Sequence, residues 1–205
     1  MYNLLGYVPT KEPRKRNPQG FLFLSPAIII VMNKVYIFFG PPSSGKSYLG
    51  KKFAEMRGYN FYEADDDYLP IYRERVKISD EERQKVFNEF YSKVIYKIKE
   101  LLQQGKPVVV ASALGNNVNR KRFIDAFKES AVFILVKSSA DLLIENAVKR
   151  EFPVLESIEL TEEKEQSLRE HLVKKINSFE KPNFRHLIID NDYTDKTLVK
   201  LSDIV

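Results

Sequence analysis

The sequence contains no cysteine, and this absence removes several classes of chemistry at once. Disulfide scaffolds, thiol nucleophiles and cysteine-based zinc sites are all excluded. Only two histidines are present, His171 and His186, which are too few to build a histidine-based metal centre. A chain without cysteine fits a reducing compartment, and the expected location is the cytoplasm.

The sequence also has no apolar run long enough to cross a membrane. The candidate, residues 21–31, reads F-L-F-L-S-P-A-I-I-I-V and is interrupted by Pro26, whereas a transmembrane helix needs about 20 apolar residues. It follows a basic stretch and so imitates a signal peptide; alternatively, Met32 is the natural start. We expect residues 1–31 to be a disordered or non-native extension, and we expect no membrane partner.

Excess charge of one sign is scarce outside that extension. The net charge is +5, and residues 1–31 contribute +3 of it, which leaves +2 for the remaining 174 residues. Nucleic-acid binding requires a concentrated basic face, so we expect no nucleic-acid partner. The length indicates one folded domain over residues 32–205.

Short apolar runs alternate with amphipathic segments along the whole domain. This alternation predicts an α/β fold: a doubly wound, three-layer architecture with a five-stranded parallel sheet. The expected strands are residues 34–39, 59–63, 107–113, 131–136 and 186–190. The first expected helix is residues 46–57, with Leu49, Phe53 and Met56 on its apolar face. The others are a long helix that begins with a capping box at Ser79 and ends by Gly105, and residues 119–129, 140–150 and 161–179.

A phosphate-binding loop follows the first expected strand. Residues 40–47, G-P-P-S-S-G-K-S, match G-x-x-x-x-G-K-[ST] between a strand and a helix. Backbone amides and the helix N-terminus would hold phosphates, with Lys46 on the β- and γ-phosphates and Ser47 on Mg²⁺. ATP and Mg²⁺ are therefore the expected cofactors, and the expected three-layer fold is that of a P-loop NTPase. The expected nucleotide contacts are Gly40, Pro41, Pro42, Ser43, Ser44, Gly45, Lys46, Ser47 and Tyr48.

The distribution of acidic residues narrows the class of P-loop protein. The N-K-x-D and D-x-x-G motifs of GTPases are absent, and the third and fourth expected strands do not end in an acid. The nearest carboxylates that follow a strand are Asp65, Asp66 and Asp67. One of them could hold the Mg²⁺ shell and another could accept the proton of an acceptor hydroxyl. This arrangement favours a small-molecule kinase and leaves open which aspartate has which role.

Four sequence blocks occur in a recognisable order. Residues 63–70 (E-A-D-D-D-Y-L-P), 78–83 (I-S-D-E-E-R), 112–114 (S-A-L) and 179–182 (F-E-K-P) resemble the E-G-D-D-x-H-P, L-x-D-x-D-R, S-A-L-K and L-E-x-P blocks of gluconate kinases. The chain from residue 34 to about 190 thus resembles the gluconate kinase and shikimate kinase branch of the nucleoside-monophosphate-kinase-like fold.

The resemblance implies roles for individual residues. It implies catalysis by Lys46, Asp65, Asp66 and Arg150, with Ser47 and Asp65 at the metal and a lid around residues 146–160. For acceptor binding it implies Asp66, Asp67, Arg73 and Arg83.

The sequence departs from the family pattern at three places. Asn146 stands where the lid has its first arginine, Gly115 stands where the third block has lysine, and the histidines of the lid and the first block are missing. We therefore expect a small polar metabolite as acceptor, most like a sugar acid, and a monomer or homodimer. A nucleoside or nucleotide kinase and a non-catalytic nucleotide-binding module are the alternatives.

Overall fold

The computed structural model describes residues 34–67, 79–155 and 162–204. The predicted five-stranded parallel sheet is present, with the strand order β2-β3-β1-β4-β5. Its strands are β1 (Val35–Phe39), β2 (Asn60–Glu63), β3 (Val108–Ser112), β4 (Ala131–Lys137) and β5 (Leu187–Asp190). β1 is central, and its last residue, Phe39, pairs with Ser112 at the end of β3.

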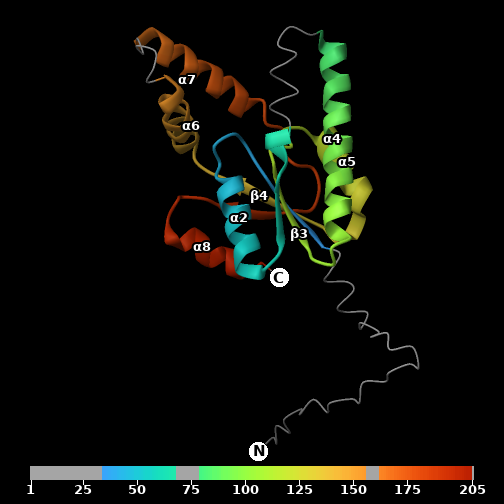
Figure 1. The fold of residues 1–205 in the computed structure, drawn as a ribbon. Coiled ribbons are helices and arrows are strands. Elements are labelled where there is room, and N and C mark those ends of the chain that lie inside the picture. The colour runs from blue at the N-terminus through green and yellow to red at the C-terminus, as the bar shows by residue number, and fades with distance from the viewer. Residues whose placement is uncertain (1–33, 68–78, 156–161, 205) are drawn as a thin grey trace, which may run out of the picture.

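Helices cover both faces of the sheet, which confirms the three-layer prediction (Figure 1). They are α2 (Lys46–Arg57), α4 (Asp80–Leu102), α5 (Asn117–Phe127), α6 (Ala140–Leu155), α7 (Glu162–Asn177) and α8 (Asp195–Ser202). Helices α2 and α8 lie on one face, and α4 and α5 lie on the other. A short 3₁₀ turn, Lys128–Ser130, joins α5 to β4.

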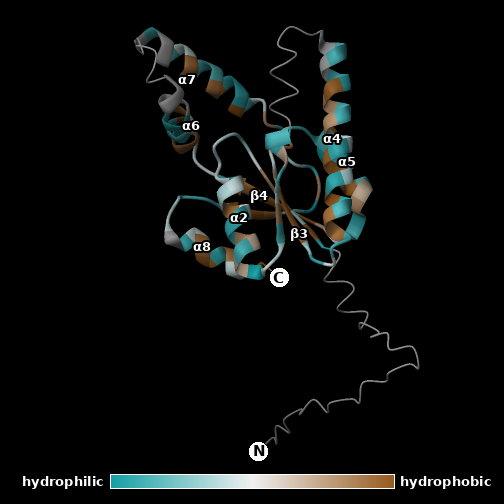
Figure 2. Ribbon diagram, in the orientation of Figure 1, coloured by the Kyte–Doolittle hydropathy of each residue, from teal (hydrophilic) through white to brown (hydrophobic). Residues whose placement is uncertain are grey.

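The apolar strands build a core on each side of the sheet. Val35, Ile37 and Phe39 of β1 pack toward α4 and α5, whereas Tyr36 and Phe38 pack toward α2 and α8. Figure 2 shows the hydrophobic residues concentrated along the strands and on the inner faces of the helices. A strand that is covered on both faces needs apolar side chains at every position, and this explains the uninterrupted apolar run of β1.

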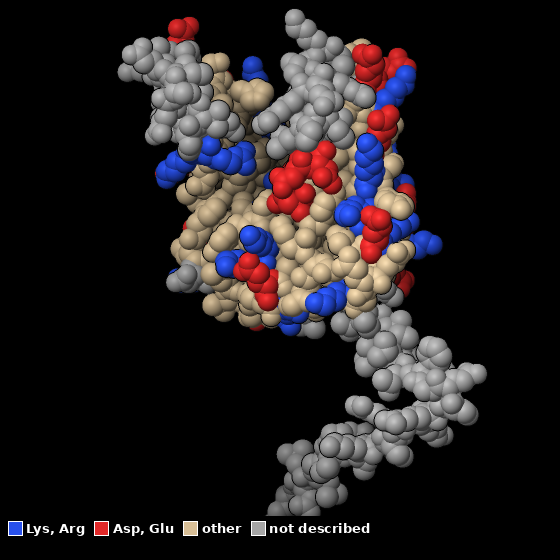
Figure 3. All heavy atoms as spheres, viewed as in Figure 1, with Lys and Arg blue, Asp and Glu red and all other residues tan. Residues whose placement is uncertain are grey.

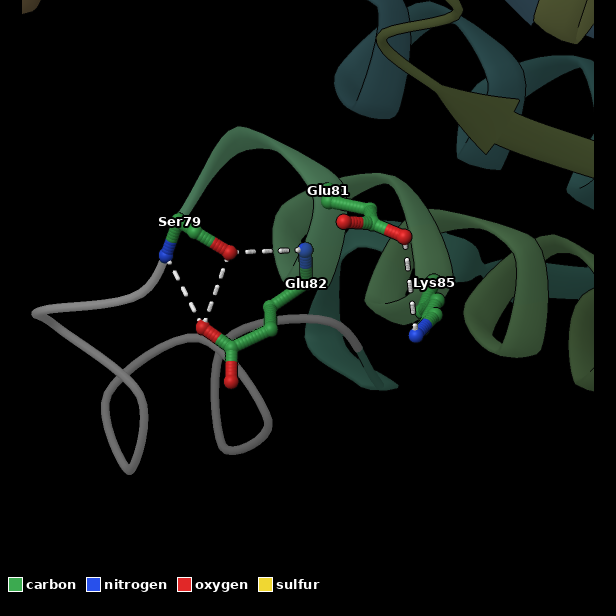
Figure 4. A network of polar contacts seen from close by, with 4 residues as sticks. All are labelled: Ser79, Glu81, Glu82 and Lys85. Atoms are coloured by element: carbon green, nitrogen blue, oxygen red, sulfur yellow. Dashed lines mark hydrogen bonds and ion pairs between the residues drawn. The ribbon is translucent and has the colours of Figure 1, made fainter.

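The predicted capping box starts α4. The Ser79 hydroxyl accepts a hydrogen bond from the Glu82 amide at 3.2 Å, and the Glu82 carboxylate accepts one from the Ser79 amide at 2.9 Å (Figure 4). Lys85 and Glu81 form an ion pair on the next turn at 4.0 Å. The cap satisfies two backbone groups that the first turn would otherwise leave unpaired.

Helices α6 and α7 form a separate pair beyond the carboxyl edge of the sheet (Figure 1). Ala147 and Val148 of α6 pack against Leu172 of α7. Helix α6 contains the described part of the predicted lid, and residues 156–160 of that lid lie outside the described residues. Among the helices of the described ranges, none combines the length and apolarity needed to cross a bilayer.

Three sequence expectations need correction. Helix α5 begins at Asn117 rather than 119, because the Asn116 side chain accepts a hydrogen bond from the Asn119 amide at 2.8 Å. Met56, expected on the buried face of α2, is 52% exposed. Helix α8 was not predicted, although its Leu201 is buried against the α2 side of the core. The extension predicted for residues 1–31 lies outside the described residues.

Candidate active site

The phosphate loop joins the central strand β1 to α2, and its glycines are fixed by their surroundings. A Cβ atom on Gly40 would lie 2.4 Å from the Val136 carbonyl oxygen, and one on Gly45 would lie 2.3 Å from the Asn191 amide nitrogen. Gly45 also has a φ of 85°, a left-handed conformation that disfavours other residues. Glycine at both motif positions is therefore required by packing and backbone geometry together.

The loop leaves unpaired hydrogen-bonding groups at the start of α2. No side chain caps this helix, and its first turn contains no acidic residue. The buried hydroxyls of Ser43 and Ser44 also have no hydrogen-bond partner among the described residues. Unpaired amides at a helix N-terminus bind anions, so the cradle fits the phosphates of a nucleotide.

The predicted pair of Lys46 and Asp65 is brought together beside this cradle. The Lys46 ammonium nitrogen lies 3.5 Å from an Asp65 carboxylate oxygen, and Lys46 is only 8% exposed. The other Asp65 oxygen accepts hydrogen bonds from the Ala113 amide at 3.2 Å and from the Ser112 hydroxyl at 3.4 Å. Asp65, which follows β2, is thus fixed by the end of β3 and faces the phosphate loop.

Glu63, the last residue of β2, joins the site although the sequence analysis assigned it no role. The Ser47 side chain next to it acts to lower the pKa of its carboxyl group, but burial, the larger influence, raises that pKa above the usual value. Its Oε1 atom is buried without a partner among the described residues. Alternation along β2 places Glu63 on the same face as Phe61, which packs on the α2 side. This alternation is the sequence pattern from which the position of Glu63 on the α2 side could have been predicted.

The donor set fits Mg²⁺. The Ser47 hydroxyl and the Glu63 and Asp65 carboxylates are hard oxygen ligands, and one Glu63 oxygen has no other partner among the described residues. The described ranges contain no group of three or more carboxylates and imidazoles that could hold a metal alone. Mg²⁺ usually takes one or two protein ligands together with water and substrate phosphates, so the site would be completed by the nucleotide.

The remaining predicted residues surround this centre. Asp66 is exposed, while Asp67 accepts a hydrogen bond from the Tyr62 hydroxyl. Tyr62 packs on the α4 side, away from the phosphate loop. Figure 3 shows acidic side chains gathered on the face above the sheet, next to residues that are not described.

For several predicted site residues, the structure shows no side-chain contact with Lys46 or Asp65 in the described part of the chain. Arg150 lies on α6 and is exposed, and Tyr48 on α2 is 54% exposed. Arg73 lies outside the described residues. Arg83 lies in the first turn of α4, and its side chain is likewise outside the description.

Arg120, which the sequence analysis did not single out, organises the loop after β3. It is fully buried and donates hydrogen bonds to the carbonyls of Leu114 at 2.8 Å and Gly115 at 3.2 Å. Its guanidinium lies over the rings of Phe39 and Phe179, 5.3 and 4.6 Å from the ring centroids. Burial lowers the pKa of this guanidinium. The loop that anchors Asp65 is therefore itself held from inside the core.

A second unpredicted element is the loop between β5 and α8. Asn191 and Tyr193 from this loop donate side-chain hydrogen bonds to carbonyl oxygens of the phosphate loop. Both contacts join segments that are far apart in the sequence, and no local pattern predicts them.

Residues 35–174 match a family model described as an AAA domain. A comparison with the sequences of curated proteins finds no match.

Solved structures share the fold at low sequence identity. A gluconokinase from Sinorhizobium meliloti 1021 superposes with a TM-score of 0.57 at 19% identity, covering 85% of this chain and 94% of that one. A sugar kinase from Janibacter sp. HTCC2649 gives 0.56 at 15% identity, with 82% and 91% covered. The Mycobacterium tuberculosis APS kinase in complex with AMPPNP and APS gives 0.53 at 13% identity, with 83% and 98% covered. These likenesses confirm the predicted fold.

Proposed function

The chain belongs to the AAA-domain family, and from this premise we propose that it is an ATP- and Mg²⁺-dependent kinase. It transfers a phosphoryl group to a hydroxyl of a small polar metabolite, most like a sugar acid. Solved structures with the same fold include a gluconokinase, a sugar kinase and an APS kinase. This supports a small-molecule acceptor. The absence of cysteine and the need for ATP favour the cytoplasm, and neither nucleic acid nor membrane is a proposed partner.

The observation that carries the proposal is the contact between Lys46 and Asp65. The 3.5 Å separation places a carboxylate next to the ammonium group that binds the transferred phosphate in P-loop enzymes. A module that only binds nucleotide has no need of a carboxylate fixed at that position by two further hydrogen bonds. The pair therefore favours catalysis over the non-catalytic alternative.

The reaction needs little covalent chemistry from the protein. The acceptor oxygen attacks the γ-phosphorus, the bond to the β,γ-bridging oxygen breaks, and ADP leaves. The hydroxyl proton passes to the carboxylate of Asp65 or Asp66. Lys46, the loop amides and Arg150 stabilise the charge that develops on the transferred group.

Mg²⁺ would be held by Ser47, Asp65 and Glu63 together with the nucleotide. When bound, the ion supplies positive charge that stabilises the phosphate oxygens. Asp66, Asp67, Arg73 and Arg83 are the proposed acceptor contacts. The segment 146–160 is the proposed lid, which would exclude water from the transfer step.

The test is a panel of acceptors assayed with ATP and Mg²⁺. Sugar acids, polyols, nucleosides and nucleoside monophosphates are supplied one at a time, ADP release is measured, and mass spectrometry identifies the phosphorylated product. We expect turnover with a sugar acid or a related polar metabolite. Transfer to a nucleoside or a nucleoside monophosphate would replace the proposed acceptor by the nucleotide-kinase alternative.

Matched variants show whether the turnover belongs to this site. Lys46→Ala should abolish transfer, whereas Lys121→Ala should leave it unchanged, since Lys121 is an exposed lysine of α5 that pairs with Asp125. Lys46→Ala with full activity, or a wild-type chain that binds ATP and phosphorylates no acceptor, would contradict the kinase assignment.

A further inference from the structure

The loop after β5 contacts the outer side of the phosphate loop through two neighbouring side chains. The side-chain amide nitrogen of Asn191 donates a hydrogen bond to the Ser44 carbonyl oxygen at 2.9 Å, and Asn191 is only 3% exposed. The Tyr193 hydroxyl donates to the Ser43 carbonyl oxygen. Two consecutive carbonyls of the phosphate loop thus have donors from residues about 150 positions later in the chain.

Further hydrogen bonds hold the loop after β5 in place. The Asn191 side-chain oxygen accepts a hydrogen bond from the backbone amide of Tyr193 at 3.0 Å. The backbone amide of Asn191 donates to the Lys137 carbonyl oxygen at 2.7 Å. Asn191 therefore uses both its side-chain oxygen and its side-chain nitrogen in hydrogen bonds. Its nitrogen also occupies the space that a Cβ on Gly45 would need.

The backbone on both sides of the contact is strained. Ser43 has a φ of 60° and Tyr193 has a φ of 59°, and neither is glycine. Left-handed residues of this kind are strained and persist only where the surroundings hold them. The hydrogen bond from Tyr193 to the Ser43 carbonyl oxygen joins these two strained residues directly.

Anchoring the carbonyls fixes the direction of the amides. Because a peptide unit is planar and trans, its N–H points away from its C=O. The Ser44 N–H closes a turn onto the Pro41 carbonyl oxygen at 3.3 Å. The Ser44 carbonyl is held by Asn191, so the Gly45 N–H is directed to the opposite side, where the motif binds phosphate.

We propose that Asn191 and Tyr193 are positioning residues that hold the phosphate loop in its nucleotide-binding shape before the nucleotide arrives. The inference rests on the proposed function, since it assigns these side chains to the ATP site. They act through the peptide units that they anchor. A preformed loop binds more tightly because the ligand does not have to order it.

The same tyrosine hydroxyl is close to the lid-bearing helix. The Asn146 amide of α6 approaches it and acts to lower its pKa, although burial, the larger influence, raises the pKa of Tyr193 overall. Asn146 precedes Arg150 by four residues, so the two lie on one face of α6. Tyr193 thus lies between the phosphate loop and the helix that presents Arg150.

The experiment is a titration of AMPPNP with Mg²⁺ by calorimetry on the full chain. Tyr193→Phe removes one hydroxyl and should weaken AMPPNP binding by about 3- to 10-fold, the value of one ordinary hydrogen bond. Asn191→Ala should weaken it by at least as much. Tyr96→Phe, on an exposed tyrosine of α4, is the matched control and should bind as the wild type does.

A second readout separates positioning from a general structural role. Both variants should raise the KM for ATP and leave the KM for the acceptor unchanged, and the melting temperature of ligand-free Tyr193→Phe should stay near that of the wild type. If Asn191→Ala fails to fold, Tyr193→Phe still decides the question. Unchanged AMPPNP affinity in Tyr193→Phe would overturn this inference and leave the proposed function intact. A wild-type chain that binds no AMPPNP would overturn the proposed function, and the inference with it.

Discussion

Asp65 and Glu63 lie beside the same phosphate loop, but the surroundings of their carboxyl groups differ. Asp65 contacts the Lys46 ammonium and accepts hydrogen bonds from the end of β3. Glu63 has one buried oxygen without a partner in the described part of the chain, and burial raises its pKa. Neighbouring carboxyls in different environments commonly take different roles in catalysis.

The two aspartates proposed as proton acceptors can be separated by kinetics. Asp66→Asn should lower kcat by about 10²–10⁴-fold if Asp66 takes the hydroxyl proton, because the amide cannot accept it. Asp65→Asn should lower kcat and also raise the Mg²⁺ concentration needed for half activity. Asp125→Asn, on an exposed residue of α5, serves as control. If both active-site variants keep kcat within tenfold, neither aspartate is the base.

The Glu63 carboxyl should make the stability of the ligand-free protein depend on pH. Its pKa is raised in the folded state, so the folded protein binds this proton more tightly, and stability falls as pH rises above about 4.5. Glu63→Gln removes the buried charge, so the variant should melt at a higher temperature than the wild type at pH 7–8. Thermal unfolding at several pH values should show that the difference shrinks toward pH 4.5. A glutamine variant less stable at every pH would contradict this account.

At the scale of elements, the loop between β3 and α5 depends on one buried side chain. Arg120 binds the Leu114 and Gly115 carbonyls, and it also donates to the Asn117 side chain at 2.8 Å. The Gly115 carbonyl oxygen additionally accepts a hydrogen bond from the Glu180 amide at 2.9 Å. The ends of β3 and α7 are thereby joined through one loop.

Arg120→Lys tests the geometry of this anchor, because it keeps the charge and removes the planar fork. Lysine has all its donors on one nitrogen and cannot reach three oxygens that contact three different nitrogens of Arg120. The free energy of unfolding should therefore fall by about 1.5–3 kcal/mol, the value of a lost hydrogen bond to a charged group. Urea denaturation measures the change, with Lys121→Ala on the exposed side of α5 as control. A variant as stable as the wild type would show that the loop carbonyls find other donors.

The elements that the sequence predicts are those with local signals. β1 is an unbroken apolar run, and α4 has both a capping box and a period of three to four residues. The start of α5 was placed two residues late because a single asparagine cap outweighs the weak apolar pattern there. Spacing alone places Met56 on the same face as Leu49 and Phe53, but it lies in the last turn of α2, just before the C-cap Gly58, and is 52% exposed.

The residues of the candidate site likewise fall into those that sequence motifs predict and those that only the fold brings together. Residues of the phosphate loop and Asp65 carry motif signals, and the structure brings them together. Asn191 and Tyr193 reach the loop only through the folded topology, because β5 lies two strands from β1 in the sheet. No composition or spacing rule connects residues so distant in sequence, so this half of the site required the structure.

On the scale of the whole molecule, the strand order brings the functional segments to one edge. β1 carries the phosphate loop, β3 anchors Asp65 on one side of it, and the loop after β5 lies on the other side. Ligands of open α/β sheets bind at the carboxyl ends of the strands, where the chain order reverses. Nucleotide binding at this edge should therefore stabilise the whole fold.

That coupling can be measured by thermal unfolding. AMPPNP with Mg²⁺ at 100 times its Kd should add about 2.7 kcal/mol of stability, a rise in Tm of roughly 5–11 °C for a chain of this size. Lys46→Ala should keep the Tm of the ligand-free protein and lose the rise, because its side chain faces the phosphates. Lys121→Ala should retain the full rise. A rise of equal size in Lys46→Ala would place the nucleotide elsewhere.

The hydrogen bond from Asn191 to Ser44 spans 147 residues, and this separation has a consequence for synthesis on the ribosome. The phosphate loop leaves the exit tunnel first, and Asn191 follows it 147 residues later. At about 5–20 residues per second, the loop exists without its supporting side chains for roughly 7–30 seconds. A nascent chain should therefore bind ATP more weakly until Asn191 has also emerged, which would limit the consumption of ATP by half-made protein.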